Sequence, residues 1–83
     1  LRNYNVSVKL FDRNGTEMTT FARQRTGQVA ASATATETFT IDIRQSWAAM
    51  QGGTYQATCT VTDSLKFKRE STDSGTIIDG LPR

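Results

Sequence analysis

The stretch GGTYQATCTVTD, at residues 52–63, decides the fold class of this chain. Successive side chains of a β-strand point to opposite faces, so Tyr55, Ala57, Cys59 and Val61 share one apolar face. The threonines and the glutamine between them form the opposite, polar face. Two glycines precede this alternation and an Asp-Ser pair follows it, which predicts one strand that ends in a hairpin turn.

Similar alternation recurs on both sides of this stretch. Strands are expected over residues 4–11, 16–24, 39–43, 65–71 and 76–78. Turn residues separate them at 12–15, 25–28, 63–64 and 72–75. The Asn-Gly pair at 14–15 tolerates the positive φ angles of a tight hairpin. The alanine-rich part at 29–35 is compatible with an edge strand, a bulged strand or a loop.

Residues 46–51 interrupt the alternation and predict one short helical turn. Ser46 has a side chain able to cap the first turn, and Gly52 can end it. Trp47 and Met50 are three residues apart, so we expect both to enter the core as a plug between sheets.

Together these segments predict an all-β fold, a small antiparallel sandwich or barrel of six or seven strands. The 83 residues are expected to form a single domain, 1–83, in which 79–83 is a tail or linker. Because the chain begins with Leu1 rather than methionine, we expect it to be an excised domain or a processed product of a larger protein.

The composition argues against an enzyme or a metal protein. The chain has no histidine and a single cysteine, so it lacks the usual general base and the ligands of a zinc site. Cys59 is expected to be a buried small apolar residue. No spaced set of aspartates suggests calcium. We therefore predict no catalytic residue, no cofactor and no metal, and no membrane insertion because no apolar run is long enough.

Glu37 lies at an apolar position of the alternation, between the alanines and Phe39. Either the strand bends there and exposes the side chain, or Glu37 is a paired carboxylate with a specific role. The sequence leaves both alternatives open.

The central stretch resembles the sixth strand of immunoglobulin-like domains, because Gly53, Tyr55 and Ala57 have the spacing of a tyrosine corner. The beginning of the chain is similar to bacterial immunoglobulin-like modules of the FxLYD type. The residues that carry this similarity are 8–12, Asn14-Gly15, Gly27-Gln28 and 38–41. The resemblance implies an immunoglobulin-like sandwich that acts outside the cytoplasm.

Aromatic and basic side chains on the expected outer faces are the candidate partner-binding residues: Phe11, Phe21, Arg23, Lys66, Lys68 and Arg69. Phe11 and Phe21 either cover each other across the first hairpin or belong to a partner surface. The basic residues either protect a strand edge from aggregation or bind a partner.

We therefore predict a non-enzymatic binding, adhesion or spacer module of a larger surface, secreted or virion protein. It would bind a protein or glycan through a sheet face or edge, and strand addition at an open edge is one such mode. One alternative is a small β-barrel that binds nucleic acid through Arg23, Arg25 and residues 66–69, where basic side chains flank Phe67. A further alternative is a small secreted inhibitor or effector.

Overall fold

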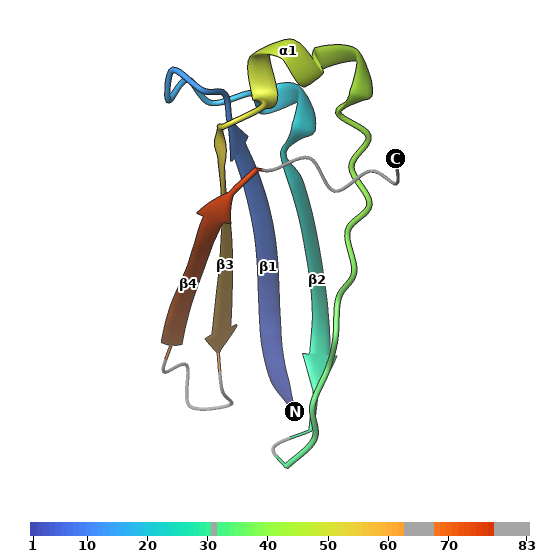
Figure 1. The fold of residues 1–83 in the computed structure, drawn as a ribbon. Coiled ribbons are helices and arrows are strands. Elements are labelled where there is room, and N and C mark those ends of the chain that lie inside the picture. The colour runs from blue at the N-terminus through green and yellow to red at the C-terminus, as the bar shows by residue number, and fades with distance from the viewer. Residues whose placement is uncertain (31, 63–67, 78–83) are drawn as a thin grey trace.

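The computed structural model describes residues 1–30, 32–62 and 68–77, and it shows an all-β chain built on one antiparallel sheet (Figure 1). The strands are β1 (Arg2–Phe11), β2 (Arg23–Val29), β3 (Thr54–Thr62) and β4 (Lys68–Thr76), in the sheet order β2-β1-β3-β4. Short helical turns lie at one end of the sheet: η1 (Thr19–Phe21), η2 (Arg44–Ser46) and α1 (Trp47–Met50).

The strand register gives the sheet two chemically different faces. In β1 and β3 the apolar positions face each other, as in the pairs Val8↔Ala57 and Leu10↔Tyr55. We call this side the apolar face. The opposite side, the polar face, carries the alternate residues of the same strands, as in the pair Ser7↔Thr58. The alternation predicted for residues 4–11 and 54–62 is therefore confirmed.

The core lies at the helical end of the sheet. Among the described residues, the buried apolar side chains are Leu10, Met50 and Ile77, and Met50 is fully buried. Trp47, Phe21, Ile41 and other partly buried side chains pack around them. The predicted helical turn and the entry of Met50 into the core are thus confirmed.

A glycine ends α1, as predicted. The predicted cap by Ser46 at the start of α1 is not formed. Gly52 follows α1 with φ of +82°, a backbone conformation that favours glycine. Ser46 makes no side-chain capping hydrogen bond.

Several predicted elements differ from the structure. Residues 25–28 are not a turn, because they lie within β2 in register with β1. Thr76 does not begin a separate strand, because it is the last residue of β4. Residues 16–24 do not form one strand, because Glu17 makes an isolated bridge to Phe11 and η1 precedes β2. Residues 72–75 are not a turn, since β4 continues through them in register with β3. Residues 39–43 are not a strand, although their apolar side chains do pack toward the sheet. The expected strand at 65–71 begins at Lys68 in the described part, and Ile78 and the tail lie outside it.

The described residues therefore form one four-stranded sheet, and neither six or seven strands nor a second sheet is seen in them. The chain from 34 to 43 runs alongside β2 without strand pairing (Figure 1). Its contacts with the apolar face take the place that the second sheet of a sandwich would have.

Gly53 allows the turn after α1 to approach the end of β1. A Cβ atom at this buried position would overlap the carbonyl oxygen of Phe11 and come within 3.0 Å of that of Met50. We expect Gly53→Ala to lower the free energy of unfolding by about 1–3 kcal/mol, because backbone must move to admit the methyl group. Chemical denaturation measures the change, with Thr54→Ala at the adjacent exposed position as the control. Equal stability of the two variants would contradict this close approach.

Candidate functional site

The structure divides the predicted partner-binding residues between the two ends of the sheet. Phe11 ends β1, and Phe21 lies in η1, partly buried against the core cluster. Arg23 begins β2, and its guanidinium donates to the carbonyl oxygens of Thr20 and Ala22, at 3.0 and 2.9 Å. These three residues are therefore at the end of the sheet that carries α1.

The basic residues of the last strand are at the other end. Lys68 pairs with Thr62 and Arg69 with Val61, so the two exposed side chains belong to opposite faces of the sheet. Lys66 and Phe67 lie outside the described residues. The described members of the predicted set do not form one continuous surface, and their role in binding stays a prediction.

A polar contact not included in that set fastens the chain from 34 to 43 to the sheet. The Tyr4 hydroxyl donates to Glu37 at 3.0 Å, and the Arg25 guanidinium lies 3.8 Å from the same carboxylate. Arg25 also stacks over the Phe39 ring, 5.0 Å from its centroid. Glu37 is thus the paired carboxylate of the two alternatives. Its place among apolar residues was the sequence signal, but its partners could not be read from the sequence.

Two charged contacts shift pKa values on this side of the molecule. The hydrogen bond to Glu37, together with partial desolvation, raises the pKa of Tyr4 above its ordinary value of 10.0. Hydrogen bonds from the Arg44 side chain and backbone lower the pKa of Asp42 from 3.8 to about 2. Both side chains of the Asp42–Arg44 pair are largely exposed, so we assign them a local role beside η2.

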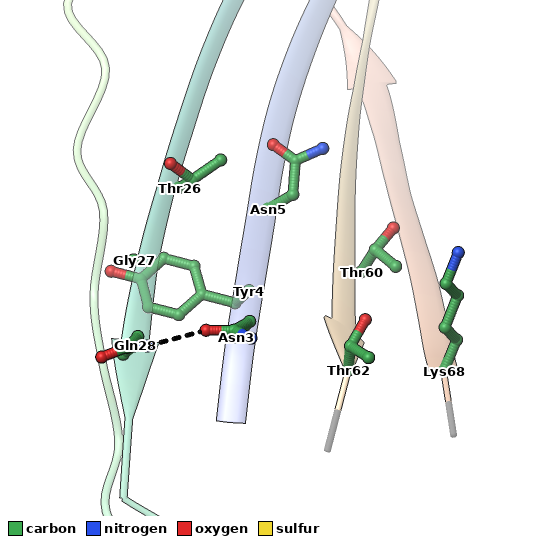
Figure 2. A pocket seen from close by; sticks show the side chains of 9 residues that line it. All are labelled: Asn3, Tyr4, Asn5, Thr26, Gly27, Gln28, Thr60, Thr62 and Lys68. Carbon is green, nitrogen blue, oxygen red and sulfur yellow. Dashed lines mark hydrogen bonds between the residues drawn. The ribbon is translucent and has the colours of Figure 1, made fainter. Parts of the chain in front are cut away.

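The polar face presents amide and hydroxyl groups around an open hollow of about 540 Å³. Figure 2 shows Asn3 and Asn5 on β1 between Gln28 on β2 and Thr60 on β3. The amides are already paired, since Gln28 donates to Asn3 at 3.0 Å and Gln24 donates to Asn5 at 2.9 Å. A ligand on this face would have to compete with those bonds.

The apolar face holds a groove of about 420 Å³ between the sheet and the chain from 34 to 43. Its walls are Val8, Leu10 and Tyr55 on the strands, with Phe39 and Ile41 opposite. Toward the other end, Cys59 and Val61 line a smaller cavity of about 230 Å³. Cys59 lies on the apolar face, as its position in the alternation predicted, but it is half-buried rather than buried.

β4 is an edge strand, and among the described residues it pairs with β3 alone. Residues 68–74 are all exposed. The Ile77 amide donates to the Gly53 carbonyl at 2.8 Å, and the register continues unbroken along β4. Odd-numbered residues of β4 therefore direct their backbone groups toward β3, and the even-numbered ones direct theirs toward the open edge.

The opposite edge, on β2, is flanked by other parts of the chain. The ion pair and the stacking contact of Arg25 bring Glu37 and Phe39 beside β2. Figures 1 and 2 both show this segment running along β2. The two edges of the sheet are therefore not equivalent, and no described residue pairs with the outer edge of β4.

Comparison with known proteins assigns no class: no family model, curated protein or solved structure matches this chain. The immunoglobulin-like resemblance accordingly stays a prediction. In the described part of the chain, no helix has the length and apolar character to cross a membrane, and no group of three or more acidic or thiol side chains is placed to hold a metal ion.

The contact between Tyr4 and Glu37 makes stability depend on pH in the alkaline range. Because folding raises the pKa of Tyr4, its contribution is fully present below pH 10.0 and is lost as pH rises through the raised value. We expect the stability of the native protein to fall toward that of Tyr4→Phe in this range. Denaturation at several pH values measures the difference between the two proteins.

The control is Glu37→Gln, which keeps a hydrogen-bond acceptor and removes the negative charge. In this variant the phenolate absorbance of Tyr4, obtained by subtracting the Tyr4→Phe spectrum, is expected to rise at lower pH than in the native protein. Identical titrations of the native protein and Glu37→Gln would show that Tyr4 and Glu37 are not in contact in solution.

Proposed function

We propose that this chain is a non-enzymatic binding module that holds a protein partner by pairing a strand of that partner with the open edge of β4. The observation that carries the proposal is the accessible backbone of β4. Lys68, Glu70, Thr72, Ser74 and Thr76 direct their amide and carbonyl groups away from β3. The Ser74 amide already donates to the Asp73 carboxylate at 3.0 Å, so a partner would have to displace that bond. An extended chain that adds to such an edge satisfies these groups with main-chain hydrogen bonds.

Most of the binding free energy in this mode comes from the main-chain hydrogen bonds between β4 and the partner strand. Each hydrogen bond contributes about 1 kcal/mol net, so the available bonds support binding at moderate affinity before any side chain is considered. Side chains of the partner that follow the register of β4 would meet Arg69, Ser71 and Asp73 on one face. Specificity then depends on polar and charged groups rather than on apolar anchors.

The charge pattern of β4 also explains why the edge is selective. Charged residues on an exposed edge strand discourage indiscriminate pairing between sheets. Lys68, Arg69, Glu70 and Asp73 supply both signs within one strand. A partner of complementary sequence offsets these charges, whereas a neutral or like-charged strand does not.

The finer features of the proposal rest on the sequence. They are an immunoglobulin-like sandwich, a location outside the cytoplasm, and adhesion as part of a larger surface, secreted or virion protein. The support for them is the tyrosine-corner spacing and the alternating strands. Nucleic-acid binding is less well supported, because Arg25 is engaged by Glu37 and Phe39 and the basic side chains of β4 point to different faces.

The proposal predicts that proline at position 72 blocks partner binding without unfolding the sheet. The Thr72 amide faces the open edge, so its loss removes one bond of the partner ladder and none to β3. Peptides selected from a displayed library against the native protein serve as probes. We expect Thr72→Pro to weaken their binding by about tenfold or more, because the proline ring also obstructs the approaching strand.

Two matched variants serve as controls in the same binding measurement. Thr26→Pro places proline at an even-numbered position of β2, on the other edge of the sheet. Thr72→Val keeps the backbone amide and replaces the hydroxyl, which lies 3.3 Å from that of Thr58, with a methyl group. Both are expected to bind the peptides like the native protein. Peptides that tolerate Thr72→Pro but are lost with Thr26→Pro would place binding at β2 and refute the proposal.

A further inference from the structure

The open edge of β4 is complementary to itself. Arg69 and Asp73 are both exposed, belong to the apolar face, and lie at equal distances along the strand from Ser71. If two copies pair antiparallel about a two-fold axis at Ser71, Arg69 of each copy faces Asp73 of the other. The arrangement produces two opposite-charge pairs from a single strand.

We propose that two copies of this chain associate through β4 in this register and join their sheets into one continuous sheet. The inference rests on the proposed function, because it uses the same open edge, and it adds that a second copy of the chain is a partner. Directly opposed residues share a face in antiparallel pairs, so the apolar faces of both copies lie on the same side.

The backbone restricts where the axis can lie. Only even-numbered residues of β4 have amide and carbonyl groups directed to the edge, so they must face even-numbered residues of the second copy. An axis through a residue meets this condition. An axis between two residues would set even positions opposite odd ones, and no ladder would form.

The charged side chains favour Ser71 over other residues of β4 as the position of the two-fold axis. An axis at Arg69, Glu70 or Asp73 would place that charged residue opposite its own copy. An axis at Thr72 would place Arg69 opposite Gly75 and create no pair of opposite charges. With the axis at Ser71, the Arg69–Asp73 pairs also occupy the sites without direct hydrogen bonds, where opposed side chains are closest.

Sedimentation over a concentration series tests the self-association, and charge reversal tests the register. Arg69→Asp sets two acidic side chains opposite each other at both pairs, and Asp73→Arg does the same with two basic ones. Each single variant is expected to associate about tenfold more weakly than the native protein, because two attractive pairs become repulsive. Arg13→Asp makes the same charge change at an exposed position of the turn after β1 and is expected to have no effect.

The decisive sample is a mixture of the two single variants. In a mixed pair, each acidic side chain faces a basic one, so association is expected to return to the native level. The double variant Arg69→Asp with Asp73→Arg is expected to return to it as well. Single variants that associate as strongly as the native protein, or a mixture that stays monomeric, would overturn the inference.

A covalent trap tests the position of the axis independently of charge. Ser71→Cys places two thiols opposite each other across the axis, at a spacing that a disulfide can bridge. Cys59 must first be replaced by alanine, because it lies opposite Ser71 within the same sheet. We expect rapid dimeric crosslinking under mild oxidation, whereas Thr72→Cys in the same background crosslinks slowly. The reverse order would overturn the register centred on Ser71.

These experiments can refute the self-association without refuting the proposed binding function. A native protein that stays monomeric at every concentration refutes the self-association alone, if selected peptides still lose affinity with Thr72→Pro. If the native protein is monomeric and Thr72→Pro also leaves peptide binding unchanged, both the self-association and the binding role of the β4 edge are refuted.

Discussion

The long-range ladder between β1 and β3 is the constraint on which the sheet depends. It joins Arg2–Phe11 to Thr54–Thr62 across half of the chain. Among the described residues, β2 pairs only with β1 and β4 only with β3, so this ladder alone joins the β1–β2 and β3–β4 pairs into one sheet. Ordering the intervening chain costs conformational entropy that the ladder and the core at its end must offset. That core is small, with Leu10, Met50 and Ile77 as its buried side chains in the described part. The molecule is accordingly extended, with a radius of gyration of 15.1 Å against about 12 Å expected for a compact chain of this length.

The parts of the fold that follow local chemistry could be predicted from the sequence. The apolar period of two at Tyr4, Val6 and Val8 reports a strand with one covered face, and so does the period at Tyr55, Ala57 and Cys59. The helical turn was predictable because Gly52 supplies the positive φ after α1, and Met50 the apolar side chain directed inward. These signals depend on residues that are near one another in the chain.

The features that depend on distant partners could not be predicted. Phe39, Ile41 and Ile43 alternate like a strand, but they run beside β2 without pairing with it and contribute side chains against the apolar face instead. The polar residues at 72–75 have the composition of a turn, yet they belong to β4 because they pair with the long strand β3. At its end Gly75 lies opposite Tyr55, whose ring fills the space of the missing side chain. The contact of Glu37 with Tyr4 and Arg25 is of the same kind, because its geometry exists only after the sheet has formed.

The way in which the chain from 34 to 43 is held has a consequence for local opening. Residues 34–42 make no backbone–backbone hydrogen bond with any other described residue. They are attached by side chains, through Glu37, Phe39 and Ile41. This covering layer can therefore detach without breaking a single bond of the β1–β3 ladder, at a free-energy cost below that of global unfolding. Its amide hydrogens would exchange with solvent almost freely while those of the central strands stay protected. Each such event would uncover the apolar face of the sheet for as long as the layer remains away.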